Sequence, residues 1–162
     1  MKSKYEQFFT AHNEHVAAVV TYHLSIEAVL GALIRRSMVH EDALERLSFA
    51  QKLSLCRALG IIHLEVFELV KKMNALRNKL AHRLGYRISL EEVHALLLAS
   101  DKVIDYPDDI ASLPLIEIRK RGCSVEELLR RLFHNVLLHI VESQDDNFDD
   151  EFYSTTDDEK LA

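Results

Sequence analysis

The sequence predicts a single all-α domain, a bundle of five to six helices, and not a β-sandwich or β-barrel. The chain has 162 residues, the usual size of one domain. It contains only four glycines and two prolines, too few for the tight turns of a many-stranded fold. Its apolar residues recur at three- and four-residue spacing behind Ser-x-x-Glu or Ser-x-x-Gln capping boxes, which are typical helix starts.

The helices can be placed in order along the chain. Capping boxes predict helix starts at Ser3…Glu6, Ser48…Gln51, Ser89…Glu92 and Ser124…Glu127. Two longer helices are expected from about 13 to 38 and from about 63 to 84, packed antiparallel. Gly60 and Gly85 supply helix ends. Residues 105–114 hold both prolines and are predicted to form the long loop, and residues 86–88 a short extended link.

Charge divides the chain into a body and a tail. From Glu142 onward, nine acidic residues accompany one base, which leaves 17 acidic and 19 basic residues in positions 1–141. We expect residues 1–143 to form the helical domain and residues 144–162 an acidic, disordered tail. Such a tail either aids solubility as a solvated segment or mimics a polyanion and competes for a basic groove.

Composition indicates a cytoplasmic protein without a metal, a cofactor or a membrane span. Cys56 and Cys123 form no CxxC motif and are too few for a disulfide framework or a zinc site. The first residues lack the apolar core of a signal peptide. Residues 16–34 are strongly apolar, but His23 and Glu27 interrupt them, which favours a buried core helix over a membrane span.

The densest polar cluster on a core-like helix is Arg77-Asn78-Lys79-Leu80-Ala81-His82. Asn78 and His82 share a helix face, whereas Arg77 and His82 point about 140° apart, so a dimer would be needed to bring an Arg and a His from each subunit into one cleft. Histidine can move protons at a ribose hydroxyl, arginine can hold a phosphate, and asparagine can orient it. Cleavage of RNA without a metal is one interpretation. A basic last turn that complements the helix dipole is the other.

The cluster also resembles the R-polar-x-x-x-H motif of the HEPN superfamily (higher eukaryotes and prokaryotes nucleotide-binding domain). Residues 47–53 (LSFAQKL), 57–62 (RALGII) and 76–82 (LRNKLAH) follow in a similar order, and the layout also resembles the mannitol-repressor family. The resemblance covers residues 16–84, and the remainder only as helices.

The resemblance implies a homodimer formed along the motif helices and, for many members, a metal-independent endoribonuclease of toxin or antiviral systems. By position, Arg77 and His82 would be the catalytic pair with Asn78 beside them, and RNA and an antitoxin or regulatory protein would be partners. Other members bind nucleic acid or proteins without catalysis. Toxins of this kind often carry a tyrosine two residues after the histidine; here that position is Leu84, and the nearest tyrosine is Tyr86.

Supporting roles are open for Glu27 and Lys79. Glu27, on an apolar helix, needs a partner, which is either His23 or the backbone, or else Arg77 or His82. His12, His15 and His23 are best explained as surface and cap residues. The basic runs 119–121 and 130–131 are either a solvated helix start or contacts to an RNA backbone.

Overall fold

The computed structural model describes residues 4–37, 44–83, 86–104 and 110–144, with side chains from Val16 onward. All regular structure in these residues is helical, which confirms the predicted all-α bundle. The elements are α1 (Lys4–Ser37), the 3₁₀ helix η1 (Leu44–Arg46), α2 (Phe49–Ala58), α3 (Leu64–His82), α4 (Leu90–Asp101), α5 (Leu115–Arg121) and α6 (Val125–Glu142). Ser3, Leu84, Gly85, residues 105–109 and residues 145–162 of the predicted tail lie outside the described residues.

The predicted break near residue 13 is wrong, because α1 runs without interruption over 34 residues. Nothing between residues 4 and 30 is a glycine or a proline, so no residue there breaks the helix. A second difference lies at residues 119–121, predicted as a helix start. They form the last turn of α5, which Pro114 precedes and Gly122 ends in the left-handed region at φ 69°.

The predicted caps are confirmed at three serines. Ser48 and Ser89 each form both halves of a capping box, with Gln51 and Glu92. The hydroxyl of Ser124 accepts a bond from the backbone N–H of Glu127. Gly60, with φ 73°, follows the end of α2 as predicted. Local side-chain-to-backbone bonds therefore decide where these helices begin.

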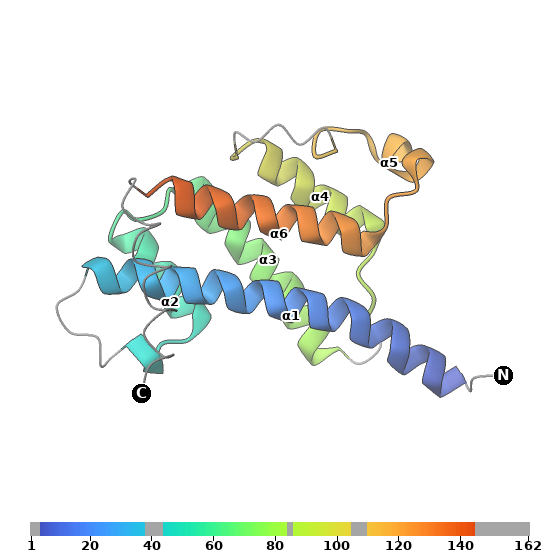
Figure 1. Cartoon of the computed structure of the whole chain (residues 1–162), viewed down its shortest axis with the longest axis horizontal. Helices are drawn as coiled ribbons and strands as arrows, with labels where there is room; N and C mark the ends of the chain where they lie inside the picture. Colours follow the sequence, from blue (N-terminus) through green and yellow to red (C-terminus); the bar gives the residue numbers. More distant parts are fainter. Residues whose placement is uncertain (1–3, 38–43, 84–85, 105–109, 145–162) are drawn as a thin grey trace, which may run out of the picture.

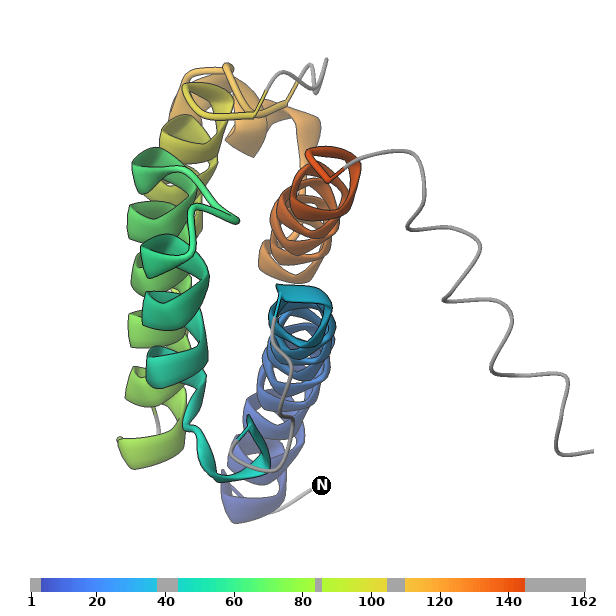
Figure 2. The same cartoon turned by 90° about the vertical axis from the view of Figure 1, so that its left-hand side faces the viewer.

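The helices form two layers (Figures 1 and 2). In one layer α1 and α6 lie side by side, and α2, α3 and α4 make up the other, with α5 at one end. The two long helices α1 and α3 run in opposite directions across the interface between the layers, as the sequence predicted. Tyr22 of α1 stacks on the buried Phe133 of α6, with ring centroids 5.3 Å apart. In this arrangement α3 packs against both α1 and α4.

Within the described part of the chain, one segment, Val16–Ser37 of α1, is long and apolar enough to cross a membrane. Its core-facing side chains, among them Val19, Ile26 and Leu30, are buried against the other helices. Such burial is typical of a helix in the core of a bundle.

Candidate functional site

The motif residues occupy the C-terminal end of α3. Leu76 and Leu80 are buried and fix the rotation of the helix against the core. That rotation leaves Arg77 and Asn78 half-buried and His82, the last residue of α3, exposed. The predicted divergence of Arg77 and His82 holds: no contact joins them within the described part of one chain.

Arg77 makes one polar contact, to the next residue. Its Nη1 donates to Oδ1 of Asn78 at 3.2 Å. Its Nε is buried, and no acceptor for it exists among the described residues. No described carboxylate pairs with this guanidinium either. The positive charge of Arg77 is therefore available to an anion, because no ion pair within the described chain neutralises it.

His82 stands at the end of the helix with its ring in solvent. It forms no hydrogen bond or ion pair to any other described residue. Arg83, which follows it, is also exposed and serves as the C-cap through its backbone N–H, bonded to the carbonyl of Lys79. The exposed imidazole of His82 and the exposed guanidinium of Arg83 are accessible to a polyanion in solution.

Lys79 is tied to α4 instead of to the other motif residues. Its Nζ lies 3.1 Å from Oε1 of Glu92 and 5.9 Å from the ring centroid of Tyr86. The Tyr86 hydroxyl donates to the same carboxylate, and burial together with that bond raises the pKa of Tyr86 to about 12. Lys79 thus joins the end of α3 to the start of α4. Sequence reasoning found Glu92 as a cap residue and missed this second role.

The prediction that His23 is a surface or cap residue is wrong, because the side chain is buried between α1, α2 and α3. His23 is only 5% exposed, and its Nε2 donates to Oδ1 of Asn74 at 3.0 Å. Its ring packs on Phe49 of α2 with centroids 4.0 Å apart. Burial lowers the pKa of His23, against the bond to Asn74, and the charge of Arg77 lowers it further.

The spacing of α1 contained the signal for this burial. His23 lies four residues after Val19 and three before Ile26, and both of these are in the core. A histidine in that register belongs to the core face of the helix. The side chains of His12 and His15 lie outside the described ones. Among the described residues, no three potential ligands of the His, Cys, Asp and Glu types come together as a metal site.

Glu27 pairs with none of the partners considered from the sequence. Its Oε1 lies 2.7 Å from Nζ of Lys52, and both side chains are largely buried, at 26% and 15% exposure. The pair joins α1 to α2 one turn away from His23. Glu27 is thus a tertiary contact of α1, and neither Arg77 nor His82 accounts for it.

Most of the basic side chains in the runs 119–121 and 130–131 form ion pairs with acidic residues. Arg119 pairs with Glu91, Lys120 and Arg121 lie 3.6 and 3.9 Å from Glu117, and Arg131 lies 3.3 Å from Glu127. These pairs reduce the field that the runs present to RNA.

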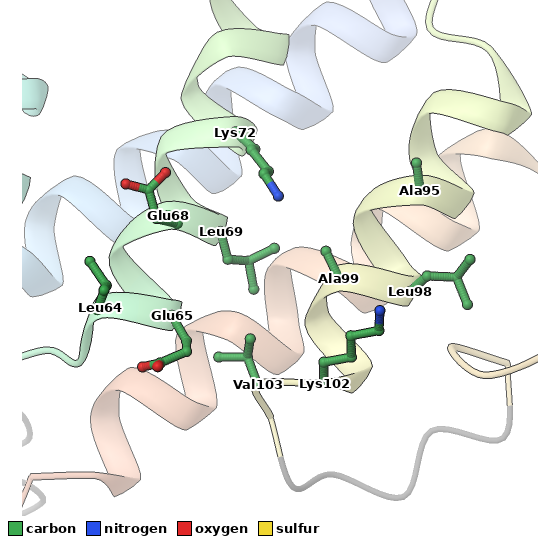
Figure 3. A pocket seen from close by; sticks show the side chains of 10 residues that line it. All are labelled: Leu64, Glu65, Glu68, Leu69, Lys72, Ala95, Leu98, Ala99, Lys102 and Val103. Atoms are coloured by element: carbon green, nitrogen blue, oxygen red, sulfur yellow. The ribbon is translucent and has the colours of Figure 1, made fainter.

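A groove of about 470 Å³ separates α3 from α4 on the outer surface (Figure 3). Its apolar side chains include Leu64 and Leu98, which are 50% and 36% exposed. Four charged side chains, Glu65, Glu68, Lys72 and Lys102, line the same groove. It lies along the N-terminal half of α3, and none of the motif residues lines it.

Comparison of the chain with protein-family models, curated proteins and solved structures finds no significant match.

Proposed function

We propose that this protein is a cytoplasmic, metal-independent endoribonuclease, of toxin or antiviral-defence type, whose site forms when two copies meet at the ends of their α3 helices. The observation that supports the proposal is the free guanidinium of Arg77, which contacts Asn78 and no carboxylate among the described residues, on the helix that ends in the exposed His82. The resemblance of residues 16–84 to the HEPN superfamily points to the same residues.

The proposed role of each residue follows from the chemistry of its side chain. Arg77 binds the scissile phosphate and stabilises the charge that develops on it. His82 moves a proton at the ribose 2′-hydroxyl or at the leaving 5′-oxygen. Asn78, already bonded to Arg77, orients the guanidinium and the phosphate. Because Arg77 and His82 diverge on one helix, the second copy completes the site.

The test is cleavage of RNA in EDTA by the wild type and by His82→Ala. Loss of a proton-transfer group lowers the rate about 10²- to 10⁴-fold. The matched control is His134→Ala, since His134 is another exposed histidine, on α6 and outside the motif. Arg77→Ala should lose activity as His82→Ala does, and His134→Ala should retain it. Equal activity of wild type and folded His82→Ala would refute the assignment.

The second copy is tested separately, by light scattering at the concentrations used for cleavage. The active species should have twice the mass of one chain. Full activity from a species of single-chain mass would refute the shared site.

A second candidate is a non-catalytic regulator, which the groove between α3 and α4 favours. Exposed leucines in a groove with charges of both signs suit the binding of another protein, such as an antitoxin or a regulatory partner. Absence of RNA cleavage from both the wild type and His82→Ala, with a folded chain, would favour this role.

A further inference from the structure

One hydrogen bond between α1 and α3, from His23 to Asn74, lies about one helical turn before the motif. His23 is held from two sides, by its bond to Asn74 of α3 and by the Phe49 ring of α2. It is nearly inaccessible to solvent. The ring therefore has one position, defined jointly by three helices.

Asn74 links this contact to Arg77. It precedes Arg77 by three residues and Asn78 by four, so the three side chains share one face of α3. Arg77 is close enough to His23 for its charge to act on the imidazole. The same face thus carries three polar side chains in order. Asn74 accepts the hydrogen bond from His23, and Arg77 donates through Nη1 to Asn78.

Arg77 needs support from its surroundings, because its own polar contacts are few. One bond to the adjacent Asn78 leaves a long side chain with several rotatable bonds, and its Nε is buried without a described acceptor. Such a side chain keeps one orientation only where neighbouring groups occupy the alternatives. The imidazole of His23 is bonded to Asn74, one turn before Arg77 on the same face of α3, and when neutral it adds no positive charge near the guanidinium.

We propose that His23 and Asn74 are positioning residues: the hydrogen bond between them holds Arg77 in the orientation that presents its guanidinium beside Asn78. The proposal rests on the proposed function for its catalytic consequence. The orientation of Arg77 itself can be measured without any activity.

The first measurement is hydrogen exchange of the Arg77 Nε–H, followed by NMR. In the wild type this proton should exchange slowly, because the atom is buried. Asn74→Ala removes the acceptor of the His23 hydrogen bond and should speed exchange of the Arg77 Nε–H at least about tenfold. His23→Gln keeps an amide N–H able to donate to Asn74 and should preserve slow exchange. His23→Leu, which has no donor, should behave as Asn74→Ala does.

A matched control separates positioning from a general loss of stability. His94 of α4 is half-buried, and its Nε2 donates to the carbonyl of Leu113 at 2.8 Å. His94→Leu removes a comparable bond far along the chain from Arg77. It should lower the unfolding midpoint and leave the exchange of the Arg77 Nε–H relative to that of core amides unchanged.

The second measurement is the kinetics of RNA cleavage in EDTA. Asn74→Ala should lower kcat about tenfold or more with little change in KM, since a displaced guanidinium loses contacts made chiefly in the transition state. His23→Gln should keep the kcat of the wild type, and His94→Leu should leave kcat unchanged per folded molecule.

The outcomes distinguish the two proposals. Unaltered relative exchange at Arg77 in both folded Asn74→Ala and folded His23→Leu would overturn the positioning role, whatever the activity. If Asn74→Ala does not fold, His23→Gln and His23→Leu decide in the same way. Fast exchange in the variants together with an inactive wild type would support the positioning role and refute the proposed function.

Discussion

Acidification from about pH 7.5 to about pH 5.0 should destabilise the folded protein through His23. The pKa of this imidazole in the folded state is lowered from 6.5, first by burial. The charged groups facing it are Arg77 of α3, which lowers its pKa, and Glu27 of α1, which raises it and is paired with Lys52 of α2. In the unfolded chain the ring regains its ordinary pKa.

The sign follows from which state binds the proton. Between the lowered folded pKa and 6.5, the unfolded chain is protonated at His23 and the folded protein is not. Stability is therefore complete above pH 6.5 and falls as the pH drops through this window. One proton changes the free energy of unfolding by at most about 1.4 kcal/mol per pH unit. From pH 6.5 to about pH 5.0 the loss is at most about 2 kcal/mol, a large share of the ~5–15 kcal/mol of an ordinary domain.

The assay is urea unfolding at several pH values for the wild type and for His23→Gln. Glutamine keeps the donor to Asn74 and does not titrate, so the difference between the two proteins isolates His23 from the other eight histidines. The stability advantage of the wild type should shrink as the pH falls below 6.5. A constant difference from about pH 7.5 to about pH 5.0 would refute a buried neutral His23.

Three further predictions concern the rest of the fold. Phe133→Ala should lower the free energy of unfolding by about 3–5 kcal/mol in urea titrations, because it opens a cavity beneath Tyr22; a loss below ~1 kcal/mol would contradict the packing. Gly122→Ala should lose about 1 kcal/mol by the same assay through its left-handed φ of 69°, although a Cβ there would meet no atom within 4 Å; a neutral effect would show that the turn relaxes. Burial raises the pKa of the Cys56 thiol to about 12, so a thiol reagent at about pH 8 should modify the half-buried Cys123 first and Cys56 only on unfolding; equal rates would contradict the burial.

Features decided by neighbouring residues were predictable. The caps at Ser48, Ser89 and Ser124 depend on groups three residues apart, and all three helices begin where predicted. The glycine that ends α2 is equally local. The separate helix start expected near residue 13 is wrong because no glycine or proline lies between residues 4 and 30 to interrupt α1.

The partners of the polar side chains near the candidate site were less predictable. Glu27 pairs with Lys52, 25 residues away, and Lys79 with Glu92, 13 residues away. The sequence alone did not indicate which base Glu27 or Glu92 would pair with. The choice depends on the rotation and crossing of whole helices, which no short spacing encodes.

The sequence alone determined that the chain is helical, where most of its helices begin, and that polar side chains cluster at the end of α3, because these properties depend on side chains and on contacts within one turn. Only the tertiary structure decided that His23 bonds to Asn74 and packs on Phe49. It also decided that Lys79 forms an ion pair while Arg77 forms none within the described chain, and that His82 is exposed. These outcomes depend on how α1, α2, α3 and α4 pack, and packing brings together residues that the sequence keeps far apart.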